Sequence, residues 1–340
     1  MSLDDQCGDD ASSILYQNNE HGVIVLDIPR SIEEAQVPSQ CLPSRRLIST
    51  EPPTAPFENP EPQDSSAYSM HSHGPFASQL ADLMTAESVT QTVSHLENVY
   101  IGPYFLPRIT SSDEELSDKS HVMPPDANYT QGLLQDTRDA FCAAAPKFDL
   151  ILMDPPWPNR SARRKKGSYN TANSVTEIRK LLSAIPVTTH LKDDGLVAVW
   201  ITNRPSILDL MTSPTGIFAQ WGLELVTEWT WLKVTASGKP LFSIDSAWRK
   251  PWEKLLIAKR RVAPKLDSLS PRIIVAAPDL HSRKPNLRGL FDKVLGQHHS
   301  GLEVFARHLT SGWWSWGDQV LLFQEPQHWI AHRNSSDVDT

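Results

Sequence analysis

The second half of the sequence predicts an α/β fold, a Rossmann-like, doubly wound and mostly parallel sheet with helices on both faces. Residues 150–153 form a continuous apolar run, the pattern of a strand buried on both faces. Leu287, Leu290, Phe291 and Val294 recur at helical spacing. Such patterns alternate along the chain. Strands are expected at 148–153, 195–201, 223–233, 253–259, 272–276, 301–306 and 318–323, and helices at 174–185, 205–220 and 286–295.

The remainder of the chain is less regular. We divide it into an acidic, partly disordered N-terminal region (1–145) that packs on a large domain (146–326), and a disordered tail (327–340). Within the N-terminal region we expect the two strands of a hairpin at 13–16 and 23–27, a helix beginning at 31–36 and another at 78–96. The stretches 38–76 and 111–125 are rich in polar and acidic residues or proline, which is typical of linkers and disorder.

The charge of the chain is unevenly distributed. The 340 residues carry a formal net charge of −8. Residues 1–146 hold 6 Lys and Arg against 22 Asp and Glu, whereas residues 147–340 hold 26 against 18, so the halves have opposite sign. The basic half fits a polyanionic partner such as nucleic acid. The acidic half is either simply solvated or competes with the substrate for the basic face.

Cysteine usage and hydropathy exclude several classes of protein. Cys7, Cys41 and Cys142 are scattered and odd in number, which argues against a disulfide framework and a zinc cluster, and no metal site is expected. No apolar run approaches the roughly 18 residues of a membrane span, and the N-terminus lacks a signal-peptide pattern. We therefore expect a soluble intracellular protein without a membrane partner.

A rigid turn follows the first strand of the large domain. Asp154 is followed by Pro155 and Pro156, which fix the backbone and remove two donors, and then by Trp157. In open α/β sheets, ligands bind at the carboxyl ends of the strands. A carboxylate and the carbonyl of Pro155, side by side, would accept both hydrogens of the exocyclic amine of adenine and localise its lone pair for methyl transfer. Trp157 would form an apolar wall for a flipped base.

Further motifs follow this turn in a fixed order. They are Trp200-Ile201-Thr202-Asn203-Arg204, Glu228-Trp229-Thr230-Trp231-Leu232-Lys233, Arg249-Lys250-Pro251-Trp252-Glu253, Lys284-Pro285, Leu302-Glu303-Val304-Phe305-Ala306-Arg307 and Gly317-Asp318-Gln319. With Asp154-Pro155-Pro156-Trp157, this series resembles the N6-adenine methyltransferases typified by the catalytic subunit of the eukaryotic mRNA enzyme. The wording is most similar to the branch called methyltransferase-like protein four.

The resemblance implies S-adenosyl-L-methionine as cofactor and a permuted order, with the catalytic turn ahead of the cofactor residues. No Gly-rich loop follows the first strand, which fits that order. The implied cofactor-binding residues are Asp154, Lys284, Glu303, Arg307, Asp318 and Gln319. Asp318 and His308 stand where relatives carry Asn. The alternatives are a solvated surface lysine at 284 and a structural ion pair at Arg307.

Candidate substrate contacts lie in two places. A basic loop directly after the turn could neutralise phosphates, or be a mobile solvated loop or a nuclear import signal; its candidate residues are Asn159, Arg160, Arg163, Arg164, Lys165, Lys166 and Tyr169. Asn203, Glu228 and Trp231 come from the later motifs, and for Glu228 and Trp231 core packing is as plausible as a pocket role. For Trp313, Trp314 and Trp316, core packing is favoured over base stacking.

The sequence thus predicts an N6-adenine methyltransferase that acts on RNA or DNA by base flipping, with Asp154, Pro155, Pro156 and Trp157 as its catalytic residues. The target is adenine or 2′-O-methyladenosine. We expect a nuclear protein, with the cytosol as the alternative, that works as a monomer unless it needs a partner subunit. A catalytically inactive methyltransferase fold that binds nucleic acid or serves as a scaffold is the alternative function.

Overall fold

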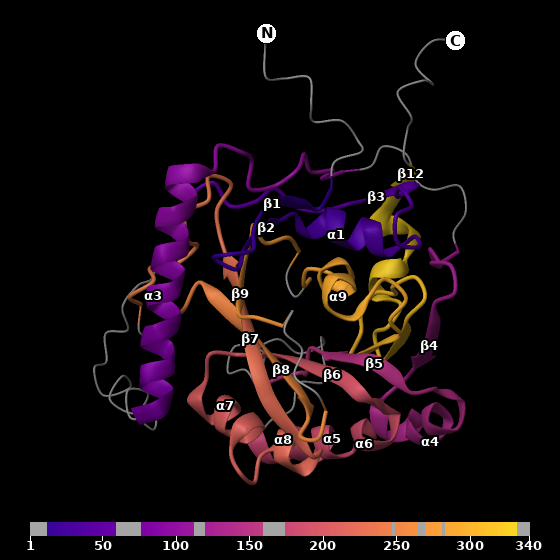
Figure 1. The fold of residues 1–340 in the computed structure, drawn as a ribbon. Coiled ribbons are helices and arrows are strands. Elements are labelled where there is room, and N and C mark those ends of the chain that lie inside the picture. Colours follow the sequence, from indigo (N-terminus) through magenta and orange to yellow (C-terminus); the bar gives the residue numbers. More distant parts are fainter. Residues whose placement is uncertain are drawn as a thin grey trace, which may run out of the picture.

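A ten-stranded sheet forms the centre of the protein (Figure 1). The computed structural model describes residues 12–58, 76–111, 120–158, 174–246, 249–263, 269–280 and 283–331. The strands lie in the order β1 (Ile14–Asn18), β2 (Val23–Leu26), β9 (Arg272–Ala276), β7 (Leu223–Lys233), β8 (Trp252–Arg260), β6 (Leu191–Ile201), β5 (Phe148–Met153), β10 (Gly301–Val304), β11 (Trp314–Gly317) and β4 (Asn128–Gln131).

Eight of these strands run in one direction, since only β1 and β8 pair with their neighbours in antiparallel fashion. Their carboxyl ends therefore meet at one edge of the sheet, called the carboxyl edge below. The predicted fold class, a mostly parallel α/β sheet, is confirmed. β5 and β10 are neighbours although about 150 residues separate them in the sequence, so the edge joins early and late motifs.

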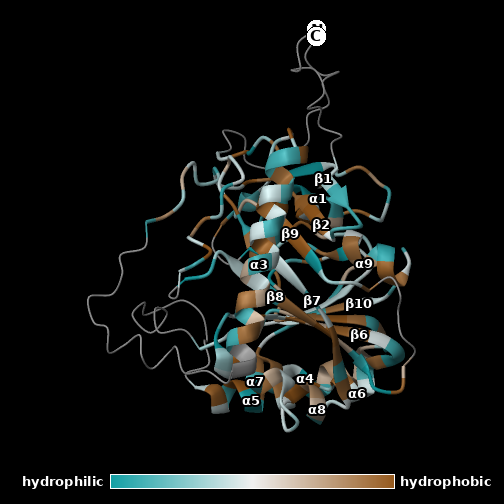
Figure 2. Cartoon of the chain, turned by 60° about the vertical axis from the view of Figure 1, so that its left-hand side comes forward, coloured by the Kyte–Doolittle hydropathy of each residue, from teal (hydrophilic) through white to brown (hydrophobic). Residues whose placement is uncertain are grey.

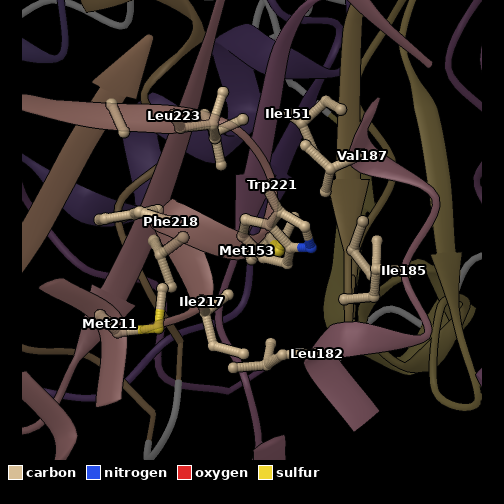
Figure 3. Packing of buried hydrophobic residues seen from close by; sticks show 14 of the residues in the cluster. Ile151, Met153, Leu182, Ile185, Val187, Met211, Ile217, Phe218, Trp221 and Leu223 are labelled. Atoms are coloured by element: carbon tan, nitrogen blue, oxygen red, sulfur yellow. The ribbon is translucent and has the colours of Figure 1, made fainter. Parts of the chain in front are cut away.

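Helices cover both faces of the sheet. On one face lie α4 (Leu134–Ala144), α5 (Val175–Ser183), α6 (Val187–His190), α7 (Pro205–Thr212) and α8 (Ile217–Gln220), at the bottom of Figure 1, and on the other lie α1 (Ile28–Ala35) and α9 (Arg288–Leu295). Alternation along β5 divides its side chains between two apolar clusters, Ile151 and Met153 facing α7 and α8 and Leu150 and Leu152 facing α9. Figure 3 shows the first cluster, and Figure 2 shows the apolar strands around β6.

The N-terminal region contributes to both sides of the sheet. The predicted hairpin is confirmed as β1 and β2, and β2 pairs with β9. Asp27 caps α1 by accepting the backbone N–H of Arg30, so the helix begins at Ile28 rather than at residue 31. The long helix α3 (Phe76–Val99) packs Val89 and Leu96 against an apolar cluster beside β9. The division of the chain at residue 146 stays a prediction.

Two predicted elements of the large domain were wrong. The apolar run 318–323 is not a strand: Trp314–Gly317 forms β11, and Leu322–Gln324 is a 3-10 turn. A short apolar run does not identify a strand without its partners. The expected helix 205–220 breaks into α7 and α8, because Ser213 is extended ahead of Pro214.

Segments expected to be linker or tail also form structure. Within 38–76, Arg45–Leu47 forms β3, and within 327–340, Trp329–Ala331 forms β12, which pairs with β3 in a two-stranded sheet. The buried Trp329 anchors this pair, donating its indole N–H to the carbonyl of Phe323 at 2.8 Å. The sequence analysis missed these strands because each has only three residues and lies within a longer polar stretch. The described helices include none that is long and apolar enough to cross a membrane.

Candidate active site

The Asp-Pro-Pro-Trp turn lies at the carboxyl edge, directly after β5. Its conformation is fixed from two sides. The Trp157 backbone N–H donates to the Pro155 carbonyl at 2.8 Å, and the Trp157 indole N–H donates to the carbonyl of Trp200, at the end of β6, at 2.8 Å. Trp157 is 7% exposed and joins the core cluster under the sheet, so it anchors the turn. Its role as a wall for a base stays a prediction.

The Pro155 carbonyl is already paired within the turn, so it is not a fully free acceptor. It accepts the Trp157 N–H, and only its second lone pair can receive a substrate amine. The Asp154 carboxylate is 22% exposed and can be reached from the edge. The turn therefore presents one charged acceptor and one shared acceptor.

A chain of alternating charges extends from Asp154. The Lys284 ammonium donates to Asp154 Oδ2 at 2.9 Å and lies 3.2 Å from Glu253 Oε2. Glu253 also accepts a hydrogen bond from Lys233, whose ammonium lies 4.6 Å from the centre of the Trp231 ring. The prediction that Lys284 faces the site, rather than solvent, is supported by its 17% exposure and these partners. Two carboxylates and two ammonium groups thus form one network at the carboxyl edge.

The charges in this network keep one another ionised. Burial alone would raise the pKa of Glu253, but Lys284 and Lys233 outweigh it and lower that pKa to about 2. Burial likewise opposes the charge of Lys284, yet Asp154 and Glu253 raise its pKa above the ordinary value. Glu253 and Lys284 therefore stay charged across the physiological pH range.

A pocket opens beside Asp154. Besides Asp154 and Lys284 its lining includes Glu303, Arg307 and His308. The space between its side chains holds about 20 Å³, so these side chains must move apart before a ligand of nucleoside size can enter. The pocket brings four of the six predicted cofactor residues together, Asp154, Lys284, Glu303 and Arg307.

Two groups in this pocket are held neutral at pH 7. Burial, followed by the negative charge of Asp154, raises the pKa of Glu303 to about 8, although Arg307 opposes this. Burial, together with the charges of Arg283 and Arg307, lowers the pKa of His308 to about 4. His308 Nε2 lies 3.2 Å from the amide nitrogen of Asn286 and 3.6 Å from Glu303 Oε2. Neutral Glu303 can donate as well as accept a hydrogen bond.

The backbone after β10 is strained at the pocket. Phe305, which lines the pocket, has a φ of 63°, a conformation that large side chains rarely adopt. Here the strand ends, two residues earlier than predicted, and the chain turns to present Arg307. The turn passes close to Gly317 at the end of β11, where an added Cβ would lie 3.2 Å from the Ala306 backbone. The Gly before Asp318 and Gln319 is thus required for close approach.

Some predicted residues lie outside the pocket lining. Trp231 is buried, packs edge-to-face on Trp200 and donates to the Ala276 carbonyl at 3.3 Å. Glu228 pairs with Lys254 at 3.2 Å. Neither Trp231 nor Glu228 lines the pocket. Asp318 and Gln319 lie on the turn after β11, next to the pocket strand β10. Trp313 and Trp316 are core residues, as favoured, with Trp316 stacked on Phe141.

The basic-loop candidates, Asn159, Arg160, Arg163, Arg164, Lys165, Lys166 and Tyr169, lie outside the described residues. The structure describes the chain up to Pro158, whose carbonyl accepts a hydrogen bond from Arg204 at 2.6 Å. Arg204 thus positions the start of the loop at the carboxyl edge.

Several buried polar atoms in the predicted motifs have no hydrogen-bond partner among the described residues. Asn203 donates to the Trp252 carbonyl at 2.5 Å, but its Oδ1 has no partner, nor has the neighbouring Thr202 Oγ1. Gln319 Oε1 is also buried without a partner. Such atoms cost stability unless a ligand or water satisfies them. Asn203 and Gln319, predicted to contact substrate and cofactor, thus each offer an unused acceptor near this edge.

Sequence reasoning missed Glu253. It stood within a recognised motif, but nothing in its spacing connects it with Lys284. Only the antiparallel placement of β8 brings it to the carboxyl edge, at the start of a strand rather than at its end. The one available signal is a count of charges: Lys233 and Lys284 both occur in the recognised motifs, and Asp154 alone cannot balance two lysines. A second carboxylate in the motifs was therefore to be expected near them.

Comparison of the sequence with known proteins shows the family. Residues 148–319, from the first residue of β5 to Gln319, match the MT-A70 family. The chain belongs to the MT-A70 family. It is 49% identical over 329 residues to the N6-methyladenosine RNA methyltransferase MTA1 of Cryphonectria parasitica, covering 94% of this chain and 95% of that one. It is 42% identical to the protein of the same name from Pyricularia oryzae, covering 96% and 98%.

The human N(6)-adenine-specific methyltransferase METTL4 is 31% identical over 235 residues, covering 65% of this chain and 47% of its own length. The resemblance to N6-adenine methyltransferases, including the methyltransferase-like protein four branch, is therefore confirmed. This MT-A70 protein is an N6-adenine-specific nucleic-acid methyltransferase.

Proposed function

We propose that the chain transfers a methyl group from S-adenosyl-L-methionine to N6 of adenine in RNA, with the target base flipped into the pocket beside Asp154. The observation that carries this proposal is the Asp154–Lys284 pair at the carboxyl edge, with Glu303 and Arg307 lining the same pocket. The choice of RNA follows the names of the two fungal relatives that cover nearly the whole chain.

The donor set fits such a cofactor. When bound, S-adenosyl-L-methionine would supply an electrophilic methyl group. Lys284 would hold its carboxylate, Glu303 and Arg307 its ribose hydroxyls, and the unused Gln319 Oε1 its adenine edge. Asp318, exposed on the same turn, can accept from a ribose hydroxyl. Glu253 keeps Lys284 charged and oriented when that lysine turns from Asp154 toward a ligand.

Asp154 has a separate task toward the base. Its carboxylate accepts one N6 hydrogen, the second lone pair of the Pro155 carbonyl accepts the other, and the nitrogen lone pair becomes localised. After transfer, the nitrogen's proton passes to Asp154 or to water. A flipped base would also meet the buried, unpartnered Asn203 Oδ1 at the end of β6.

The test is methyl transfer from labelled cofactor to RNA and DNA oligonucleotides of identical sequence. Asp154→Ala should lower the rate on the order of 10³-fold or more, because a charged acceptor at the reacting amine is removed. Asp149→Ala is the matched control: that carboxylate lies at the amino end of β5, the strand that precedes Asp154, and pairs with Lys192. The Asp149→Ala variant should keep most of the activity. Calorimetry should show that Asp154→Ala binds the cofactor within a few-fold of the wild-type affinity.

Each outcome decides something. Transfer to DNA but not RNA would overturn the choice of substrate. Equal losses in both variants would assign Asp154 a structural role. Absence of cofactor binding in the wild type would contradict the cofactor assignment and favour a scaffold.

A further inference from the structure

A second cavity lies at the amino ends of the parallel strands, opposite the carboxyl edge that carries Asp154. It holds about 500 Å³ and is formed where the turn between β1 and β2 meets the start of β9 and the end of α9. Its lining includes Arg272 and Lys293, the amides of Gln17, Asn18 and Asn19, and the hydroxyl of Ser270. Since β2 and β9 are parallel and Arg272 begins β9, the cavity lies at the amino ends of these strands. We call it the Arg272–Lys293 cavity.

Arg272 packs on an aromatic pair at this cavity. Its guanidinium carbon lies 5.0 Å from the centre of the Trp229 ring. Trp229 in turn stacks on Phe291 of α9, with ring centres 4.8 Å apart, and donates its indole N–H to the Ser270 carbonyl at 3.0 Å. The Nη1 of Arg272 is buried and has no hydrogen-bond partner. A guanidinium with an unused donor is suited to an anionic ligand.

Lys293 adds a second positive charge. Its ammonium donates to Gln17 Oε1 at 2.5 Å, which ties the last turn of α9 to β1. The described residues that line the cavity include no carboxylate. Burial lowers the pKa of Arg272, and burial followed by the charge of Arg272 lowers that of Lys293. The two cations thus repel each other across a cavity that contains no compensating acid.

We propose that the Arg272–Lys293 cavity is a phosphate-binding site separate from the catalytic pocket. A guanidinium fork, an ammonium, side-chain amides and a hydroxyl can surround the oxygens of one phosphate group. The volume suits a nucleotide-sized ligand. The phosphate belongs either to the backbone of an RNA strand outside the catalytic pocket or to a free nucleotide. The site does not depend on the proposed methyl transfer.

Two probes distinguish these sources. The first is a single-stranded oligouridine, which offers phosphodiesters but no adenine, and the second is adenosine monophosphate. Binding is followed by fluorescence anisotropy and calorimetry for the wild type, Lys293→Gln and Arg272→Gln. Lys180→Gln is the matched control, since it removes one exposed cation from α5 on the far face of the sheet. Because Lys293 is exposed, its variant should fold even if Arg272→Gln does not.

If the ligand is an RNA backbone, Lys293→Gln should weaken the binding of oligouridine about threefold or more. It should also reduce the slope of log affinity against log salt by about 0.7. If the ligand is a free nucleotide, the same variant should weaken the binding of adenosine monophosphate and leave the affinity for oligouridine unchanged. Either result supports the site, provided that Lys180→Gln has no comparable effect. Equal behaviour of Lys293→Gln, Lys180→Gln and the wild type toward both probes would overturn it. Methyl transfer is read separately and does not affect this outcome.

Discussion

The pocket beside Asp154 and the Arg272–Lys293 cavity place their cations in opposite surroundings. In the pocket, Lys284 lies between two carboxylates, and its pKa is raised although burial opposes its charge. In the cavity, Lys293 shares the space with another cation, and its pKa is lowered. Burial lowers the pKa of both lysines; two carboxylates outweigh it at Lys284, whereas the charge of Arg272 adds to it at Lys293.

The difference also separates two uses of charge. The pocket network is self-compensating, so it is part of the folded structure before any ligand arrives. The cavity has an excess of positive charge, which costs stability until an anion binds. Removing a cation should therefore damage the pocket and leave the cavity unharmed.

The largest expected effect is that of Lys284→Met. It leaves Asp154 and Glu253 near each other without their shared cation, so we expect a loss of about 2–3 kcal/mol in the free energy of unfolding. Cofactor affinity should fall on the order of 100-fold. Urea denaturation and calorimetry measure the two effects.

Lys192→Met is the control, because it removes the partner of Asp149 from a pair in which the lysine side chain is 42% exposed. It should cost less than about 1 kcal/mol. If both variants lost the same stability, the self-compensating network would not be a special feature of the pocket.

How far the sequence predicts the site depends on how local the signal is. Asp154 and its turn were found because an apolar strand, two prolines and a tryptophan stand in one short segment. Lys284, Glu303 and Arg307 needed the resemblance to other methyltransferases, since nothing in their own segments connects them with Asp154. Glu253 and the Arg272–Lys293 cavity were missed because their partners meet only when distant strands pair.

The same limit applies to the fold. Long periodic segments such as β7 and α5 were located correctly, with small shifts at their ends. Errors arose where tertiary contacts override composition. Trp329 is buried in a three-residue strand within a polar tail. Val320 and Phe323 are buried in a turn whose apolar sequence predicted a strand.

The neutral carboxyl group of Glu303 should make the stability of the protein depend on pH. The pKa of Glu303 rises from an ordinary 4.5 to about 8 in the folded protein. Between these pH values the unfolded chain has released the proton that the folded chain keeps, so the free energy of unfolding falls as pH increases. Glu303→Gln removes this dependence. The difference in the free energy of unfolding between the variant and the wild type should therefore shift in favour of the variant by on the order of 2 kcal/mol from pH 5 to pH 8.

Urea denaturation at both pH values checks this expectation. Glu87→Gln removes an exposed carboxylate from α3 and serves as the control for loss of one charge. Parallel pH profiles for Glu303→Gln and wild type would mean that Glu303 is ionised in the folded protein. The pocket would then hold one more negative charge than the comparison assumes.

The smallest expected effect is that of Lys293→Gln on stability without ligand. Because Lys293 is exposed and faces Arg272 rather than an acid, its removal should leave the free energy of unfolding unchanged or raise it by at most about 0.5 kcal/mol. Any gain should disappear at high salt, where the repulsion is screened. Added oligouridine or adenosine monophosphate should then stabilise the wild type more than the variant, since only a ligand of the folded state raises its stability. A loss of stability comparable to that of Lys284→Met would show that an acid compensates Lys293 after all, and the contrast between the two regions would fail.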